Sequence, residues 1–239
     1  MDRFYRHWIK DSDLISFNVV VKQTDLYIRA RRNLKNKALK SMLKHRTPLE
    51  KYIGLHPLFL TTLEPYHADA DAPTIVKEMC WASQIAGVGP MAAVAGAMAE
   101  AVGKDLLPFS SEVIVENGGD IFLKTSKERL IGIYAGQSPF TGKIALKIKP
   151  RETPLGICTS SATIGHSLSL GSTDAVIALS KSTPLADAIA TAIGNRVKEA
   201  NDISKAIEKA QDIKELHGIV IIKGDKIGIW GRAKIVPLG

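Results

Sequence analysis

The stretch between Gly156 and Thr191 carries the side chains of this chain that are best suited to chemistry. It places the thiol of Cys158, the imidazole of His166 and the carboxylate of Asp187 among small hydroxyl residues in otherwise apolar sequence. Polar groups cost free energy when they are buried without a partner. The stretch therefore indicates either a ligand or metal site, or a structural network in which these groups satisfy one another.

Asp187 and Thr191 form a candidate metal site. They lie four residues apart on a helix that we predict over residues 184–197, so their side chains share a face. Both offer hard oxygen atoms, which suit Mg²⁺, usually with nucleotide phosphates completing the octahedron. The alternative is structural, because Asp187 would lie in the first turn after Pro184 and favour the helix dipole, while Thr191 would bond back to a carbonyl. The spacing fits both interpretations.

A second candidate is the run from Glu116 through Gly118 and Gly119 to Asp120, which lies between two predicted strands. Consecutive glycines tolerate positive φ and let a backbone approach a ligand closely. Asp120 would then accept a hydrogen bond from a ligand hydroxyl or amide. The alternative is a plain hairpin turn, since Asn-Gly is a strong hairpin signal.

A third candidate is the turn formed by Gly87, Gly89 and Pro90, which leads into a predicted helix rich in alanine and glycine over residues 90–102. The free N–H groups at the start of a helix attract anions. The turn matches neither a dinucleotide fingerprint nor a P-loop. Its small residues also fit tight packing of the helix on a sheet, and both readings can hold together.

His166 and Cys158 are the candidate catalytic residues. His166 stands in a loop of small residues, where it would act as a general base or bind phosphate; a structural role is the alternative. Cys158 lies in a predicted strand, and it is either a nucleophile or sulfur carrier or a small buried hydrophobe.

The bulk properties are those of a globular protein of 239 residues with a net charge of +8. Residues 1–51 contain 13 Lys and Arg against 5 Asp and Glu, whereas residues 52–239 contain 19 of each. This basic segment is either a solvated helix face or a phosphate-binding patch. The segment lacks the interleaved aromatics and the motifs that are typical of nucleic-acid binding. We therefore do not expect a nucleic-acid partner.

No apolar run reaches the roughly 20 residues that a membrane-spanning helix needs, and the first residues contain no signal core. Two cysteines are too few for a disulfide scaffold. We therefore expect a reduced, cytoplasmic protein without a membrane partner. Self-association into a homo-oligomer is left open by the sequence.

The element order predicts an α+β fold. A hairpin over residues 14–31 precedes a basic helix, and Thr47, Pro48 and Glu50 form a capping box that predicts a second, separate helix. We expect Gly103 to end the helix that begins at Pro90. Strands are predicted at 111–116, 120–124, 129–134, 143–149, 155–159, 174–179, 218–223 and 226–230, with helices at 184–197 and 201–214. The order suggests two ββααββ halves in one domain spanning residues 1–239.

Taken in order, these segments resemble the ApbE superfamily of flavin transferases. The residues from Val113 to Ile121 are similar to the strand and Gly-Gly-Asp motif of that family. Thr159 and Ser160 resemble its Thr-Ser-Gly loop, and residues 186–191, Ala-Asp-Ala-Ile-Ala-Thr, match its Ala-Asp-Ala-x-x-Thr helix. The glycine-rich turn lies where the family has a helix beside the flavin nucleotide. The ordered set covers roughly residues 80–200.

The resemblance implies an ApbE-like fold of the T-fold type and a site for FAD or FMN. It implies Mg²⁺ ligands at Asp187 and Thr191, with Asp120 and Thr159 near the nucleotide. His166 stands where the family's transferases begin a His-x-x-Asp-Pro-x-Thr-Gly motif, but the aspartate, proline and threonine are missing here. The family's helix lysine is missing too. These departures bear on FMN transfer to a protein threonine more than on FAD binding.

The whole chain looks most like a short cytoplasmic ApbE-like subfamily of archaea and anaerobic bacteria, which has no settled activity. We therefore expect a protein that binds a flavin nucleotide or a related small phosphate ligand with Mg²⁺, and that could be a transferase. One alternative is an enzyme that incorporates sulfide during homocysteine formation, which would give Cys158 a role. Another is a non-catalytic protein that binds a partner through the basic segment.

Overall fold

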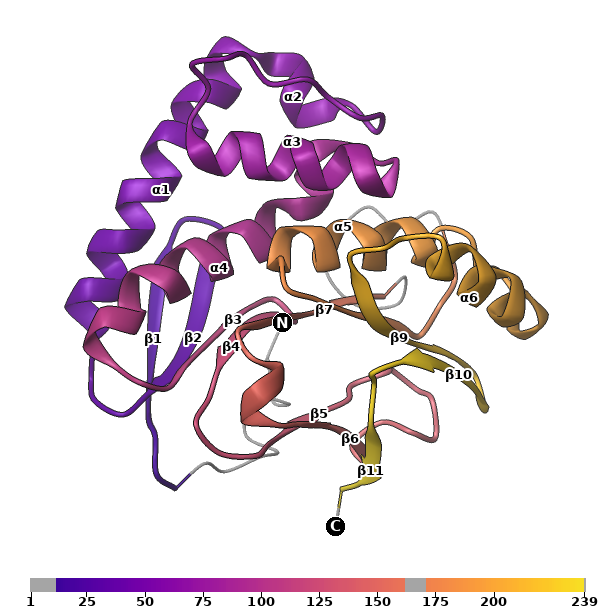
Figure 1. Cartoon of the computed structure of the whole chain (residues 1–239). Helices are drawn as coiled ribbons and strands as arrows, with labels where there is room; N and C mark the ends of the chain where they lie inside the picture. The colour runs from indigo at the N-terminus through magenta and orange to yellow at the C-terminus, as the bar shows by residue number, and fades with distance from the viewer. Residues whose placement is uncertain (1–11, 162–170, 239) are drawn as a thin grey trace.

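The structure is a computed structural model that describes residues 12–161 and 171–238. Its centre is an eight-stranded antiparallel sheet with the order β1-β2-β3-β4-β7-β8-β9-β10 (Figure 1). The strands are β1 Ile15–Val21, β2 Thr24–Ala30, β3 Val113–Asn117, β4 Asp120–Lys124, β7 Leu155–Ser160, β8 Ala175–Ser180, β9 Leu216–Lys223 and β10 Lys226–Gly231. The prediction of an α+β fold is confirmed.

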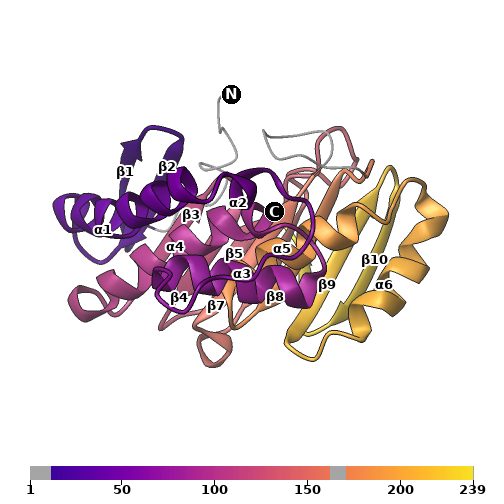
Figure 2. The same ribbon diagram turned by 90° about the horizontal axis from the view of Figure 1, so that it is seen from above.

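The helices cover one face of this sheet (Figure 1). The first four follow β2, and the last two follow β8. They are α1 Lys35–Leu55, α2 Pro57–Thr61, α3 Thr74–Ala86, α4 Val94–Leu106, α5 Thr183–Gly194 and α6 Ile203–Gln211. Seen from above, α1 lies towards the β1 end and α6 towards the β10 end (Figure 2). The predicted ββααββ order thus holds for strands β1–β4 and again for strands β7–β10.

A second sheet lies against the other face (Figure 1). It has three antiparallel strands in the order β11-β6-β5, namely β5 Arg129–Gly132, β6 Ile144–Ile148 and β11 Ile235–Pro237. Its residues Ile131 and Leu146 share a core with Ile157 and Ile177 of the large sheet. The sequence did not predict β11, because three residues are too short to show a period.

Alternation along each strand decides which core a side chain joins. In β2, Leu26 and Ile28 are fully buried towards the helices, whereas Tyr27 between them lines a cavity together with residues of the second sheet. In β7, Cys158 joins the helical core while Ile157 joins the core between the sheets. The strands β3, β4, β7, β8 and β9 therefore each contribute to two separate cores.

The predicted break at Pro48 is wrong, because α1 continues through it from Lys35 to Leu55. Proline inside a helix costs about 3 kcal/mol. A continuous helix keeps Leu49 and Tyr52 on the face that already buries Met42. Burying each large apolar side chain contributes roughly 1.5–3 kcal/mol, so the two together offset the cost of the proline.

Gly103 does not end a helix either, because α4 runs on to Leu106. A Cβ atom at this position would lie 2.1 Å from Cδ1 of Phe122. The glycine is therefore required by the close approach of α4 to the ring on β4, which is a tertiary contact that the sequence does not show. Within the described residues no single helix is long and apolar enough to cross a membrane, and only the bent pair Thr74–Ala86 with Pro90–Phe109 passes such a test together.

A buried ionic network joins the start of β3 to the start of β5. Glu112 is fully buried, and its carboxylate accepts hydrogen bonds from Arg129 at 2.7 Å, from Ser126 at 2.7 Å and from Thr125 at 2.7 Å. Arg129 also pairs with Asp13 at 2.8 Å. Burial alone would raise the pKa of Glu112, but the hydrogen bonds from Arg129, Ser126 and Thr125 outweigh it and lower the pKa to about 2.

We predict that Glu112→Gln lowers the free energy of unfolding by about 3 kcal/mol at pH 7, because it removes the buried negative charge that pairs with both Arg129 and Arg31. The folded pKa lies below the ordinary value of 4.5. The contribution is therefore complete above that value and is lost as the pH falls towards about 2. Urea unfolding between pH 7 and pH 2.5 measures it. Glu215→Gln, at an exposed position, is the control. A difference in unfolding free energy between Glu112→Gln and the wild type that stayed the same in acid would contradict this explanation.

Candidate functional site

Helix α5 is buried along its length except at two positions. Asp187 and Thr191 are partly exposed, and every other residue from Thr183 to Gly194 is buried. They are four residues apart, so their oxygen atoms lie on one stripe of the helix. On this otherwise apolar helix, the carboxylate and the hydroxyl therefore form a polar stripe on one face.

The carboxylate of Asp187 lies at the start of another helix. Its Oδ2 atom accepts a hydrogen bond from the backbone N–H of Gly96 at 2.8 Å, in the first turn of α4. The N-cap of α5 itself is Ser182, whose hydroxyl accepts from the N–H of Leu185 at 3.4 Å. The interpretation of Asp187 as a first-turn residue of its own helix is wrong, because α5 begins at Thr183 and its first turn contains no acidic residue. Asp187 satisfies the start of α4 instead.

Asp120 supplies a second negative charge beside Asp187. It is the first residue of β4 and is 6% exposed. Burial raises the pKa of Asp187 well above its usual range, and the charge of Asp120 raises it further, against the lowering effect of the Gly96 N–H group. Two carboxylates held this close resist ionising together. A divalent cation would neutralise both.

The donor set fits a cation that also binds a ligand. Across residues 12–161 and 171–238 no group of three or more His, Cys, Asp or Glu is placed to hold a metal ion. A site closed by such side chains alone is therefore not found in that part of the chain. Mg²⁺ commonly takes one or two carboxylates and completes its shell with phosphates and water. Asp187, Asp120 and the Thr191 hydroxyl match that chemistry.

Cys158 lies close to these carboxylates but is fully buried. Its Sγ atom donates to the carbonyl of Thr183 at 3.3 Å. Burial raises the pKa of the thiol well above its usual range, and the charges of Asp120 and Asp187 add to the effect. Since the thiolate is the nucleophile, the geometry favours the small buried hydrophobe over a reactive cysteine. His166 lies outside the described residues.

The Gly118–Gly119 turn is a two-residue hairpin between β3 and β4, closed by the pairing of Asn117 with Asp120. Both glycines have positive φ, 69° and 107°. Oε1 of Glu116 accepts the N–H of Gly119 at 2.9 Å and holds the turn. Gly118, Gly119 and Thr159 face the cavity between the two sheets, not the helices. The predicted site residues are thus divided between the two faces of the large sheet.

The turn before α4 is explained first by packing. Gly87 ends α3 with a φ of 71°. A Cβ atom on Gly89 would lie 1.9 Å from the carbonyl oxygen of Thr62. Pro90 is buried and begins a short 3-10 helix, Pro90–Ala93, which separates the glycines from the first turn of α4. A role of Gly87, Gly89 and Pro90 in binding phosphate stays a prediction.

A cavity of about 910 Å³, counting its open mouth, lies between the helices and the β1–β2 hairpin. We call it the helix-side cavity. Its apolar lining comes from α1, α2, the 3-10 helix Pro90–Ala93 and α4, and its polar lining from α1, the β1–β2 hairpin and β3. The lining residues are Gln23, Thr24, Arg46, Leu49, Glu50, Ile53, Leu60, Met91, Val94, Ala95, Met98 and Asn117.

Two contacts join this cavity to the carboxylates. Ala95 lines the cavity and precedes Gly96, which binds Asp187. Its carbonyl accepts the side-chain amide of Asn117 at 3.1 Å, and Asn117 pairs with Asp120 across the hairpin. The cavity therefore reaches two residues that adjoin the contacts of the aspartates, although neither aspartate lines it.

Sequence reasoning did not identify the residues that line this cavity. Met91, Val94 and Met98 follow a helical spacing, which only marks them as one face of a helix. Arg46 donates to Glu50 at 2.8 Å and to Gln23 at 2.6 Å, so it joins α1 to the β1–β2 turn. That contact spans 23 residues and leaves no local signal.

A family model described as AbpE bacteria matches residues 6–226 of the chain. A UPF0280 protein of Methanocaldococcus jannaschii is 44% identical over 220 residues, which are 90% of this chain and 89% of that protein. A UPF0280 protein of Methanocella arvoryzae is 46% identical over 195 residues, which are 81% of this chain and 79% of that protein.

Solved structures share the fold at low sequence identity. The flavin transferase ApbE from Vibrio cholerae aligns with a TM-score of 0.59 and 15% identity over 92% of this chain and 97% of that one. The crystal structure of the ApbE protein from Thermotoga maritima gives a TM-score of 0.64 and 10% identity over 90% and 96% of the two chains. The expectation of an ApbE-like α+β fold is confirmed.

We predict that Asp187→Asn stabilises the protein in the absence of metal. The new amide still accepts the N–H of Gly96 and removes the repulsion from Asp120, so the Tm at pH 7 with EDTA should rise by about 2 °C or more. The pKa of Asp187 is raised on folding from its ordinary value of 3.8, so the wild type loses stability as the pH rises above that value. The variant should lack this loss.

Thermal unfolding from pH 4 to pH 8 tests this prediction. Asp212→Asn is the matched control, since the side chain of Asp212 is 73% exposed. A Tm of Asp187→Asn below that of the wild type throughout the range would show that the carboxylate is needed for folding.

Proposed function

We infer, because this chain belongs to the ApbE-like family, that it binds a flavin nucleotide together with Mg²⁺ on the helical face of its large sheet. The observation that carries the proposal is the polar stripe of α5. Asp187 and Thr191 are its only partly exposed positions. Asp187 lies beside Asp120 and binds the N–H of Gly96, whose neighbour Ala95 lines the helix-side cavity. Stability alone gives no reason to bury two repelling carboxylates at one end of a cavity.

Each part of the site has a role in the proposal. Asp187 and Thr191 supply oxygen ligands to the cation, and the nucleotide phosphates complete its shell. Bound Mg²⁺ supplies positive charge that offsets both the carboxylates and the phosphates. Asp120 accepts a hydrogen bond from the nucleotide or shares the cation.

The helix-side cavity would hold the organic part of the nucleotide. Met91, Met98 and Ile53 give it an adaptable apolar surface, because unbranched methionines fit irregular shapes. Asn117 and the pair of Arg46 with Glu50 give it polar edges. A mostly apolar cavity with a few placed polar groups is the usual form of a cofactor site.

Transfer of a flavin-derived group is the finer part of the proposal. It is supported by the fold shared with the Vibrio cholerae flavin transferase. His166 is our candidate for the general base, and it stays a hypothesis. We expect the reaction to take place in the cytoplasm. The alternative in sulfur assimilation needs a reactive thiol at Cys158, and the burial of that thiol argues against it. The alternative of a non-catalytic partner-binding protein is not needed to explain the carboxylate pair.

FAD titrations with and without Mg²⁺ test the proposal. We expect Mg²⁺-dependent binding to the wild type, with affinity lost at least tenfold in Asp187→Asn and weakened in Thr191→Val, because each removes an oxygen ligand or its charge. FAD at 100 times its Kd should add about 2.7 kcal/mol of stability. Asp212→Asn is the control. An unchanged Tm with FAD and Mg²⁺, or equal binding by Asp187→Asn, would reject the site.

A further inference from the structure

Strand β1 lies at one end of the large sheet, and within residues 12–161 and 171–238 no strand pairs with its outer edge. It runs for 7 residues, from Ile15 to Val21, without a charged residue, a proline or a glycine. An edge strand presents a row of unpaired N–H and C=O groups that can pair with a strand of another chain. Proteins usually protect such edges with charges, proline, bulges or very short strands. The register of β1 with β2 contains no bulge, so β1 has none of these protections.

The other sheet edges carry the protection that β1 lacks. Strand β10, at the opposite end of the large sheet, begins with the exposed Lys226 and ends at Gly231, whose φ is 75°. Glycine weakens a strand and often marks a bend. The outer strands of the small sheet, β5 and β11, are only 4 and 3 residues long. Among the described strands, this contrast singles out β1 as an edge that is open to pairing.

The outward backbone groups of β1 belong to alternate residues. The β1–β2 hairpin closes with a two-residue turn, where Val21 pairs with Thr24. The closing pair of such a hairpin is hydrogen-bonded, and hydrogen-bonded pairs then alternate along the strands with pairs that are not. Ser16, Asn18 and Val20 therefore direct their N–H and C=O groups away from β2. All three residues are exposed, and Val20 is 59% exposed.

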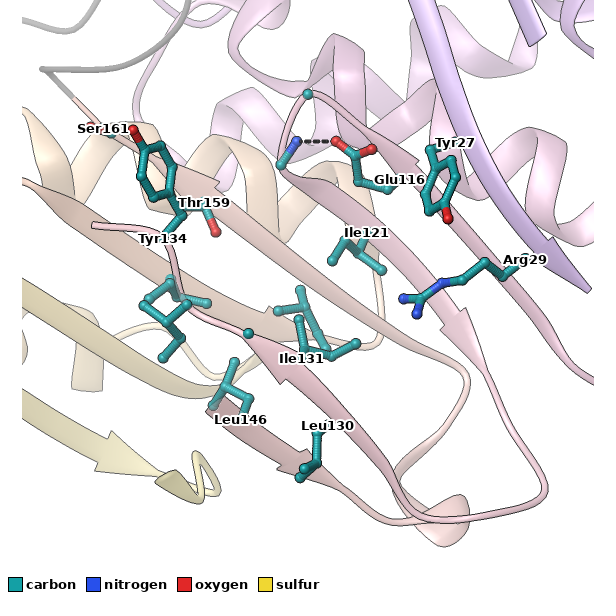
Figure 3. Close-up of a pocket in the computed structure, with 16 residues that line it drawn as sticks. Tyr27, Arg29, Glu116, Ile121, Leu130, Ile131, Tyr134, Leu146, Thr159 and Ser161 are labelled. Carbon is teal, nitrogen blue, oxygen red and sulfur yellow. Dashed lines mark hydrogen bonds between the residues drawn. The ribbon is translucent and has the colours of Figure 1, made fainter. Parts of the chain in front are cut away.

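The second sheet does not extend as far as β1. Figure 3 shows Tyr27 and Arg29 of β2 at the cavity between the two sheets, and no residue of β1 lines that cavity. Phe17 and Val19 of β1 are buried in the core on the helical face of the large sheet. β1 therefore lies outside that cavity, and a strand that pairs with its outer edge would extend only the large sheet.

Helix α1 has one side towards α4 and another towards the β1–β2 hairpin. On the first side, Lys44 and His45 contact Asp105 of α4 at 3.1 and 3.0 Å. On the second side, Arg46 donates to Gln23 of the hairpin turn at 2.6 Å. Because α4 packs on β3 and β4, the second side of α1 faces the β1 end of the sheet.

Two exposed leucines lie on this second side of α1. Leu39 lies seven residues before Arg46, and Leu43 lies three residues before it, so the three side chains share one side of the helix. Leu39 is 39% exposed and Leu43 is 44% exposed. Lys37 instead lies over the ring of Phe109, 3.9 Å from its centroid, on the side towards α4. The basic helix α1 is therefore apolar at two exposed positions on the side towards the β1 end.

We propose that β1 is the contact surface for a second copy of this chain, and that the two β1 strands pair antiparallel across a two-fold axis at Asn18. Ser16 then pairs with Val20 of the partner subunit, and Asn18 pairs with Asn18 of the partner subunit. Each such pair exchanges two hydrogen bonds, about six in all. The two eight-stranded sheets become one continuous sheet. The contact goes beyond the proposed function and does not rest on it, because it contains no part of the Asp187 stripe.

A second copy fits this surface because the surface is complementary to itself. A two-fold contact requires the same patch on both subunits. The three residues with outward groups are spaced evenly about Asn18, so a two-fold axis there gives every outward donor an acceptor of the other copy. β1 brings no charged side chain against its own copy. The exposed leucines of the two α1 helices lie on the same face of the joined sheet, one pair on each side of the axis.

Sedimentation velocity of the full chain across a range of concentrations tests the inference. We expect a reversible dimer. Asn18→Lys and Asn18→Asp should each weaken it at least tenfold, because each places two like charges directly opposite one another. An equimolar mixture of the two variants should restore the dimer, because opposite charges then meet across the axis. Ile229→Lys, at an exposed position of β10, is the control and should leave the dimer unchanged.

The outcomes decide between this pairing and its alternatives. A wild type that stays monomeric at every concentration overturns the inference and leaves the β1 edge to a different partner. A dimer that persists at wild-type strength in both Asn18 variants also overturns it, as does a mixture that dimerises no better than either variant alone. Leu43→Gln should weaken the dimer, whereas Leu58→Gln, which makes the same change at an exposed position of α2, should not. Circular dichroism and Tm show whether each variant is folded, and Leu43→Gln decides the matter if the Asn18 variants are not.

Discussion

The hydrogen bond from the Gly96 amide to the Asp187 carboxylate is the contact on which the rest of the site depends. It joins α4, which belongs to the first ββααββ half, to α5, which belongs to the second. The two helices can meet because Gly96 has no side chain, and a Cβ atom there would lie 2.6 Å from the carbonyl oxygen of Thr183. The positive end of the α4 dipole then helps to hold a negative charge at a place where burial and Asp120 both oppose it.

The large sheet acts as a divider between two chemical environments. Asp120, the first residue of β4, faces the helices, while Gly119 in the turn beside it lines the cavity between the sheets. The hairpin at Gly118 and Gly119 is the place where both environments come within reach of the same few residues. This arrangement lets one short motif serve a carboxylate site on one side and an apolar cavity on the other.

The stability of the fold comes from parts of the structure other than the carboxylate pair. The helical core and the core between the sheets are both aliphatic, and the buried network around Glu112 and Arg129 closes the corner between them. The carboxylate pair contributes repulsion to the folded state instead. Sites that bind ligands commonly carry such a cost, which the surrounding structure offsets.

The sequence by itself determined the described strands other than β11, most helices and the repeated element order, because period-two and period-3.6 patterns are local. It also singled out Asp187, Thr191, Gly118, Gly119 and Asp120 as residues suited to a site. Only the tertiary structure decided that α1 continues through Pro48, that Asp187 caps α4, and that Gly119 and Asp120 serve different faces. The tertiary structure also decided which residues line the two cavities, such as Arg29 in one and Arg46 and Met98 in the other. Each of these results rests on contacts between residues far apart in the chain, whose energies no local pattern encodes.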